Sequence, residues 1–166
     1  SLTGSWGGNS FAGLVLRSDI APARLAAIPD GSTNTVLVAE KWLNPKRLGA
    51  DGGDNEPWCN AGWDECIVRI GGGTFTYPYN NGQPAISGTS PNRTVARTPR
   101  PDMEAPFVVN SSGATVTIWN QSFGSSHSAM NALMGDGSIR RVNFGVDPAV
   151  WQAACTRNGG EANNLN

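Results

Sequence analysis

Clusters of turn-forming residues interrupt this chain at short intervals, and they limit it to short secondary-structure elements. Segments such as DGGDNEP, GGGT, NNGQP and SGTSPNRT combine glycine, proline, asparagine and aspartate, the residues that turns and loops favour. All four of these segments lie between residues 45 and 106. Long helices do not fit between such breaks, whereas short strands do. We therefore predict a β-rich α+β fold, with an antiparallel sheet, short helices and long loops.

The length and the charge balance narrow the classes of function. The chain has 166 residues, the size of an ordinary domain, so we predict one globular domain over residues 1–166. Lys plus Arg number 12 and Asp plus Glu number 13, which provides no single-sign field to gather nucleic acid. No apolar stretch approaches the roughly 20 residues that span a bilayer. We therefore expect no nucleic-acid partner and no membrane span within these residues.

The expected elements follow from local patterns. Apolar or alternating runs predict strands at residues 11–17, 33–43, 66–70, 94–97 and 114–120. Short helices are predicted at residues 21–28, where Pro22 suits a first turn, and at residues 147–155, where Asp147 is the N-cap and Pro148 follows. The stretch from residue 45 to residue 106 is otherwise predicted to be loop.

The segment MNALM-GDG-SIRRVNF predicts a β-hairpin near the end of the chain. Asp136 and Gly137 form its turn, and Gly137 supplies the positive φ that a tight turn requires. Leu133 and Ile139 are predicted to face the core. A valine at position 137 would then destabilise the fold by about 1–3 kcal/mol or more, because a β-branched residue avoids positive φ.

The cysteines leave two interpretations open. In WCNAGWDEC, six residues separate Cys59 from Cys66, a spacing that a loop or wide hairpin brings within disulfide range. Alternatively, both stay reduced and pack as small hydrophobic side chains. Three cysteines cannot all pair within one molecule, so Cys155 is expected to be free or to pair between molecules. A zinc site is not favoured, because no second Cys or His pair lies at ligand spacing.

Acidic side chains in the loop DGGDNE predict a calcium site. Asp51, Asp54 and Glu56, with Asp64 nearby, offer oxygen ligands in a flexible loop. The spacing differs from that of an EF-hand, and Asp-Gly pairs also form ordinary turns. We therefore expect weak binding of Ca²⁺ that orders this loop, and no other cofactor.

The single histidine and the tryptophans allow more than one role. As a general base, His127 would need a nucleophile and an orienting carboxylate within reach, and the chain has no Gly-x-Ser-x-Gly motif. The structural interpretation, which we favour, has the imidazole bond the backbone or Asp136 and fix the loop before the hairpin. Trp58 and Trp63 lie in the polar loop, where they would be able to stack on sugars. The expected core tryptophans are Trp42, Trp119 and Trp151.

Two segments far apart in the sequence form a recognisable pair. The first is DGSTNT, with Asp30, Gly31 and Asn34, followed by Ala39-Glu40-Lys41. The second runs from His127 through Asn131, Asp136, Gly137, Ser138 and Arg140 to Asp147-Pro148. Together they resemble the bacterial prepilin-like proteins of unknown function, related to type IV pilins and pseudopilins. In the C-terminal domain of those proteins, nine residues lie between a histidine and an Asp-Gly pair. Only eight residues separate His127 from Asp136 here, so the local loop is shorter.

The resemblance implies a function that the residues alone do not give. Such proteins carry a short leader, which prepilin peptidase cuts, and a long apolar helix, so we expect this chain to be the C-terminal head of a longer product. It implies a non-enzymatic, pilin-like surface or filament subunit outside the cell, held to the membrane only by that absent helix. Its partners would be identical or related subunits. Some pilin-like proteins of secretion systems use calcium to order a C-terminal loop, which supports the calcium prediction.

A second function class stays open beside the first. It is an extracellular hydrolase or carbohydrate-binding domain. It would use His127 with Asp136, or the loop that carries Trp58 and Trp63.

Overall fold

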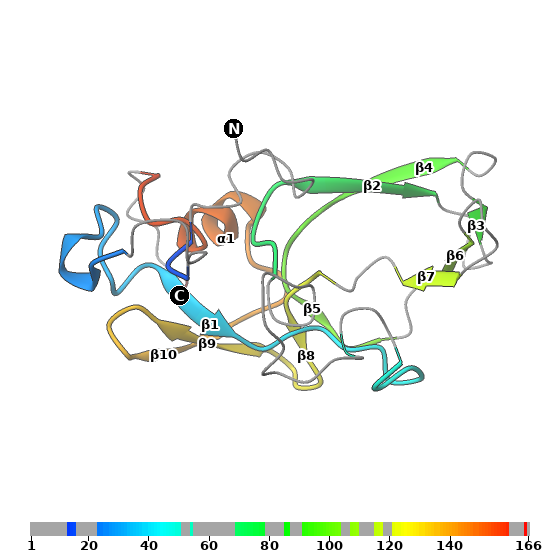
Figure 1. Cartoon of the computed structure of the whole chain (residues 1–166), viewed down its shortest axis with the longest axis horizontal. Helices are drawn as coiled ribbons and strands as arrows, with labels where there is room; N and C mark the ends of the chain where they lie inside the picture. Colours follow the sequence, from blue (N-terminus) through cyan, green and yellow to red (C-terminus); the bar gives the residue numbers. More distant parts are fainter. Residues whose placement is uncertain are drawn as a thin grey trace.

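The computed structural model describes residues 13–15, 23–50, 54, 69–78, 85–86, 91–103, 107–109, 115–117, 121–159 and 165. Within these ranges the chain is mostly sheet, with a single short α-helix. Figure 1 shows two groups of strands that are linked by a long two-stranded ribbon. The protein is therefore a small, β-rich α+β fold, as the turn clusters predict. None of the described helices has the length and hydrophobicity of a membrane span.

The elements follow in chain order. A single 3-10 turn, η1, spans Leu25–Ala27. The strands are β1 (Val36–Ala39), β2 (Thr74–Pro78), β3 (Ala85–Ile86), β4 (Asn92–Ala96), β5 (Arg100–Pro101), β6 (Phe107–Val109), β7 (Thr115–Thr117), β8 (Gly124–Ser125), β9 (Met130–Met134) and β10 (Ile139–Val142). The helix α1 spans Pro148–Ala154.

The central sheet has the order β1-β9-β10, and both pairings are antiparallel. Its middle strand alternates between the two faces of the sheet: Met130, Ala132 and Met134 are fully buried, whereas Asn131 is exposed. This period of two is what a half-buried strand requires. One face of the sheet therefore lines the core, and the other meets solvent.

The helix α1 covers the inner face of this sheet. It begins where Asp147 caps it, because the Asp147 side chain accepts hydrogen bonds from the backbone N–H groups of Ala149 and Val150. Pro148 occupies the first turn, where its missing N–H costs nothing. Trp151 is fully buried and meets Phe123 edge to face, with ring centroids 5.2 Å apart. The predicted helix is confirmed, and so are the core positions of Trp42 and Trp151.

Smaller sheets complete the described fold. The ribbon β2-β4 is antiparallel, the sheet β3-β6-β7 combines one parallel and one antiparallel pairing, and β5-β8 is a short parallel pair. In Figure 1 the ribbon extends from the central sheet toward β3, β6 and β7. The sequence predicts an antiparallel sheet, and the short parallel pairings are an addition to that expectation.

The predicted orientation of the hairpin is wrong. Ile139 is 73% exposed and Leu133 is half-buried, so both belong to the outer face. The three-residue turn pairs Leu133 with Ile139 and places Met134 in the core instead. A shift of one residue reverses every side chain in a strand. Asn131, two positions before Leu133, is exposed on the same outer face, and its polarity is the local signal for this facing.

Several expected elements differ from the structure. The strand at 11–17 is not seen, since Gly13–Val15, its only described part, forms a bend. The strand at 33–43 is confined to β1, and residues 69–70, the described end of the strand at 66–70, are not extended in a sheet. The stretch predicted to be mostly loop contains β2, β3 and β5, beside the expected strand that is β4. The helix at 21–28 is reduced to η1.

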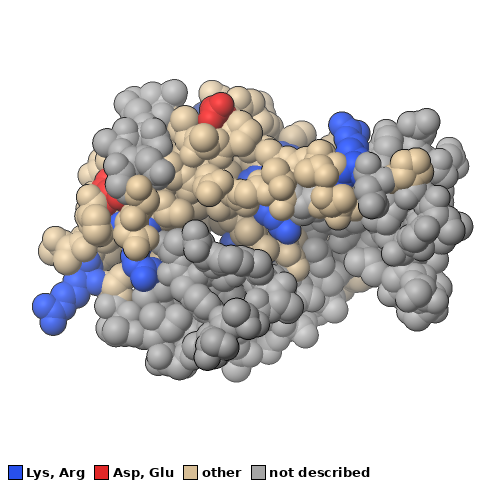
Figure 2. Space-filling view, turned by 90° about the horizontal axis from the view of Figure 1, so that it is seen from above, with Lys and Arg blue, Asp and Glu red and all other residues tan. Residues whose placement is uncertain are grey.

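Charged side chains of the described residues can be located on one face of the molecule. Figure 2 shows one face of the molecule, where Lys and Arg side chains form separate patches among uncharged residues.

Candidate functional site

The first motif segment forms a turn that fastens the end of the chain. Asp30 is 8% exposed, and its Oδ2 accepts a hydrogen bond from the backbone N of Gly159 at 2.8 Å. The turn closes locally, because Asn34 Nδ2 donates to the carbonyl of Asp30 at 3.1 Å. Gly31 has φ 84°, a left-handed conformation that glycine adopts without strain. Asp30 therefore ties the segment after α1 to the segment before β1.

The same turn contacts the hairpin turn of the second motif segment. The backbone N of Gly135 donates to the carbonyl of Thr35 at 2.8 Å, and the Thr33 side chain donates to Asp136. Gly135 lies so close to Ser32 that a Cβ at this position would press on the Ser32 backbone. Two segments about 100 residues apart in sequence thus form one packed unit.

Asp136 and Gly137 build the hairpin turn as predicted. Asp136 Oδ1 accepts hydrogen bonds from Ser138 Oγ at 2.6 Å and from Ser138 N at 2.9 Å, and these bonds lower the pKa of its carboxyl. Gly137 has φ 87°, the left-handed position that follows a type I turn in a three-residue loop. The turn thus uses the Asp136 carboxylate to hold its own backbone.

Glu40 joins β1 to two other strands. Its Oε2 accepts a hydrogen bond from Asn131 N at 2.7 Å, and its backbone carbonyl accepts one from Gly124 N at 3.1 Å. The chain leaves β9 at this residue and pairs next with the segment before β8, through the bridge between Lys41 and Phe123. Glu40 is therefore the point where the central sheet connects to the β5-β8 pair.

His127 lies on an exposed loop before β9, and its backbone N donates to Ser125 Oγ at 3.2 Å. Asp136 lies beyond the other end of β9, a strand roughly 16 Å long at about 3.3 Å per residue. The two side chains therefore do not meet. A hydrogen bond from the imidazole to Asp136 is excluded, and so is a catalytic pair of these two residues, because an extended strand separates them.

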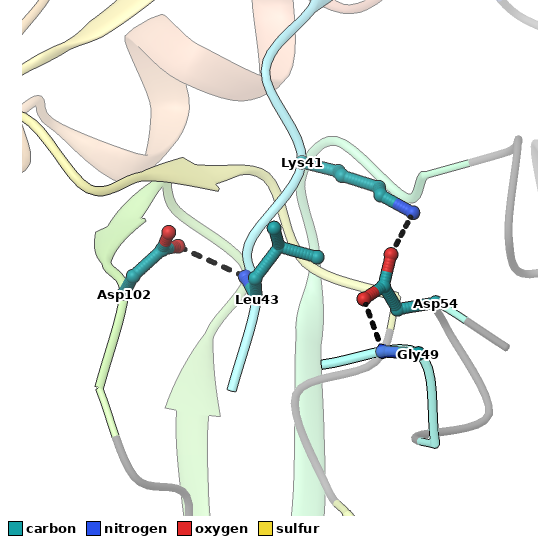
Figure 3. A network of polar contacts seen from close by, with 5 residues as sticks. All are labelled: Lys41, Leu43, Gly49, Asp54 and Asp102. Atoms are coloured by element: carbon teal, nitrogen blue, oxygen red, sulfur yellow. Dashed lines mark hydrogen bonds and ion pairs between the residues drawn. The ribbon is translucent and has the colours of Figure 1, made fainter. Parts of the chain in front are cut away.

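Asp102 is the carboxylate that His127 approaches. Its Oδ1 accepts a hydrogen bond from Leu43 N at 2.9 Å (Figure 3), and its own N donates to the carbonyl of Ser125 at 2.9 Å. Burial raises the pKa of this carboxyl, and the charge of Glu40 adds to the increase. The Leu43 N–H and the positive form of His127 oppose it without cancelling it. Asp102 holds the segment after β5 against Leu43.

The raised pKa of Asp102 predicts a pH dependence of stability. Because its folded-state pKa lies above the unfolded value, its contribution is fully present below about the ordinary value of 3.8 and is lost as the pH rises through the folded-state pKa. The variant Asp102→Asn keeps an acceptor for Leu43 and does not ionise. Thermal melting should show wild type losing stability relative to Asp102→Asn as the pH rises toward neutral. A difference that stays constant with pH would contradict this assignment.

Asp54 is the one predicted calcium ligand that the structure describes. Its Oδ1 lies 2.8 Å from Lys41 Nζ and its Oδ2 accepts from Gly49 N at 2.9 Å (Figure 3). Burial would raise the pKa of this carboxyl, but the bonds from Lys41 and Gly49 and the charges of Lys41 and Arg69 outweigh it and lower the pKa. A bound Ca²⁺ would compete with Lys41 for this carboxylate. No group of three ligand side chains is present among the described residues.

Several predicted site residues lie outside the described ranges. They are the other calcium candidates Asp51, Glu56 and Asp64, the cysteines Cys59 and Cys66, and the tryptophans Trp58, Trp63 and Trp119. The calcium site, the disulfide and the sugar-binding loop therefore stay predictions. Cys155 is a free thiol whose pKa is raised by burial, and it packs against Gly71.

A family model matches residues 1–149, and its description is "Protein of unknown function (DUF1559)". The chain belongs to this family. No curated protein and no solved structure matches it significantly. The match covers both motif segments up to Asp147 and Pro148, so the packed unit that they form lies almost wholly within the family's extent.

Two contacts of this DUF1559 chain were missed by sequence reasoning. Asp102 lies in the Pro-rich segment TPRPDM, which is typical of a loop. Lys41 stands next to Glu40 in sequence, and nothing local points to Asp54 as its partner. Both contacts join residues that tertiary pairing alone brings together, 59 residues apart for Asp102 with Leu43 and 13 for Lys41 with Asp54. A carboxylate after a short strand is a weak signal, and no local pattern names its partner.

The hydrogen bond from Gly159 N to Asp30, which we call the Asp30 clamp, should stabilise this DUF1559 chain. Asp30→Ala removes the acceptor for Gly159 N and leaves that group without its charged partner, at an expected cost of about 1.5 kcal/mol. Chemical denaturation measures the change. The matched control is Asp147→Ala, which removes a helix cap at an exposed site and should cost about 1 kcal/mol. An unchanged midpoint for Asp30→Ala would show that the clamp contributes nothing.

Proposed function

We propose that this chain is the globular head of a pilin-like surface or filament subunit and acts without catalysis. One observation carries the proposal: Asp30, Glu40 and Asp136 each accept a hydrogen bond from a backbone N–H of the fold. A carboxylate engaged in this way holds the backbone in place and is poorly placed to exchange protons with a substrate. The motif residues therefore build the head.

The pilin-like part of the proposal rests on the resemblance of both motif segments to prepilin-like proteins with the histidine and Asp-Gly domain. A sheet covered on its inner face by a helix, with the other face open to solvent, suits a head displayed on an assembly. Sparse charge gives little long-range repulsion between copies, which is compatible with dense packing of identical subunits. The proposed location is outside the cell, and the proposed partners are identical or related subunits.

An observation also favours the second candidate, an extracellular hydrolase. His127 is exposed, lies close enough to Asp102 to influence its pKa, and follows Ser125 and Ser126. Acyl-transfer sites combine an imidazole as base with a serine nucleophile and a carboxylate that orients the imidazole. Asp102 is engaged by Leu43 N, however, and the Ser125 hydroxyl accepts from the backbone of His127, so both groups have structural uses.

Electron microscopy of the native source, with gold-labelled antibodies raised against this head, tests the proposal. We expect the label along filaments or at the cell surface. Label confined to the cytosol, or to a secreted particle without filaments, would contradict the proposal.

The variant His127→Ala separates the two candidates. As a replacement on an exposed loop, it should change the free energy of unfolding by about 0.5 kcal/mol or less and leave surface display intact. Loss of a measured esterase or glycosidase turnover in this variant, with assembly preserved, would favour the hydrolase instead.

A further inference from the structure

The outer face of the central sheet carries a continuous apolar row. Val38, Leu133 and Ile139 lie directly opposite one another across β1, β9 and β10. Val38 is 56% and Ile139 is 73% exposed, although both are large apolar side chains. The row is a small apolar surface on three adjacent strands that a second protein surface would be able to cover.

A second row beside the first carries charges of opposite sign at its two ends. Arg141 on β10 is opposite Asn131 on β9, and Glu40 continues the row on the side of β1 through its bonds to Asn131. Arg141 is exposed and donates to Ser128 Oγ at 2.5 Å, and Glu40 is half-buried. The row therefore reads positive, neutral and negative from β10 to β1.

We propose that this outer face, made of Val38, Glu40, Asn131, Leu133, Ile139 and Arg141, binds the same face of a second copy of the chain. A two-fold axis parallel to β9 reverses the strand order between the copies. Val38 then meets Ile139 of the second copy, and Leu133 meets its own equivalent. The same rotation places Arg141 over Glu40 of the second copy, twice in the complex, so charge and apolar surface match together.

Other arrangements of two copies match less well. A two-fold axis perpendicular to the strands sends the charged rows to opposite ends, where they find no partner. Pairing of two β10 edges in antiparallel register would set Arg140 opposite Arg141, and like charges directly opposite are destabilising. The face-to-face arrangement is therefore the one that the charges favour.

The contact is small, so it is weak for a single pair. Three strands about 4.8 Å apart, each about four residues long, present roughly 200 Å² per copy, against about 800 Å² per partner in a standard stable interface. Several such contacts formed at once between two assemblies would bind them stably, although a single contact would not. If the heads are displayed on filaments, a statement that rests on the proposed function, this face would join neighbouring filaments side by side.

Solution NMR of the isolated chain tests the contact independently of any filament. Spectra of ¹⁵N-labelled protein are recorded from about 0.05 to 2 mM, and salt is added at the highest concentration. We expect concentration-dependent shifts confined to the amides of the outer face, and a decrease of these shifts as salt screens the two charge pairs. Ile139→Lys and Arg141→Glu should each reduce the shift changes at least about fivefold.

The control is Leu48→Lys, because Leu48 is 61% exposed and lies in a turn that is not part of β1, β9 or β10. It should leave the shift changes intact. Spectra that do not change with concentration, or shifts that centre on another surface, would overturn the proposal. So would shift changes that persist in both outer-face variants. A failure of the filament imaging with positive NMR results would remove the proposed function and leave this contact standing.

Discussion

Replacement of Trp151 by alanine is expected to lower the free energy of unfolding by about 3–5 kcal/mol. Trp151 is fully buried, and it connects α1 to the central sheet within the main core cluster, beside Met130 and Val142. Its edge-to-face contact with Phe123 also holds the segment before β8. Alanine would leave a cavity in contact with all of these groups. Urea denaturation, followed by circular dichroism, measures the loss.

The control for this variant is Leu48→Ala, a truncation at a side chain that is 61% exposed. It should change stability by about 0.5 kcal/mol or less. Equal, small effects of the two variants would mean that α1 does not pack on the sheet as the structure has it.

Replacement of Gly137 by valine is expected to cost about 3 kcal/mol, the second largest effect. Gly137 has φ 87°, and a Cβ there would meet no atom within 4 Å. The cost therefore comes from the backbone conformation alone, which a β-branched residue avoids. Thermal melting of the variant beside wild type measures it.

Two comparisons isolate this cause. Gly145 also has open space around its Cβ position, but its φ lies outside the left-handed region, so Gly145→Val should be nearly neutral. Gly137→Asn should be milder than Gly137→Val, because asparagine tolerates positive φ. Equal melting temperatures for Gly137→Val and the parent would disprove the turn assignment.

The sequence predicts the elements that local patterns define. The cap formed by Asp147 and Pro148 gives α1, and Gly-Asp-Gly between two apolar runs gives the hairpin of β9 and β10. Both signals act within a few residues, so no tertiary information is needed. The predicted facing of the hairpin is wrong. Asn131, the polar residue of MNALM, lies on the same face as Leu133 and is exposed, whereas Met130, Ala132 and Met134 belong to the core cluster with Trp151.

The strand β2 was missed although a local signal was present. TFTYP alternates threonine with aromatic residues, a period of two that favours a strand. The surrounding glycines and prolines outweighed it, and β2 is stabilised by its pairing with β4, which lies about 20 residues further along the chain. Strands that depend on distant partners in this way are not fixed by their own residues.

In the candidate site, too, local motifs could be predicted from the sequence, whereas contacts between distant residues could not. The sequence identifies Asp30, Glu40, Asn131 and Asp136 as motif residues, and the structure brings their two segments into contact. It also suggests a pairing of His127 with Asp136 that the length of β9 rules out. Proximity in sequence misled here, because nine residues in an extended strand span far more distance than nine in a loop.

The central claim is that carboxylates of the motif clamp the fold by accepting hydrogen bonds from backbone N–H groups. Amide hydrogen exchange tests this claim most directly. Asp30 and Glu40 accept hydrogen bonds from the backbone N of Gly159 and of Asn131. We expect both amides to exchange slowly in the wild-type chain, and Gly159 alone to lose its protection in Asp30→Ala while Asn131 keeps it. If both amides exchange at the rate of an unprotected peptide in the folded wild-type chain, the motif does not clamp the fold and the account is wrong.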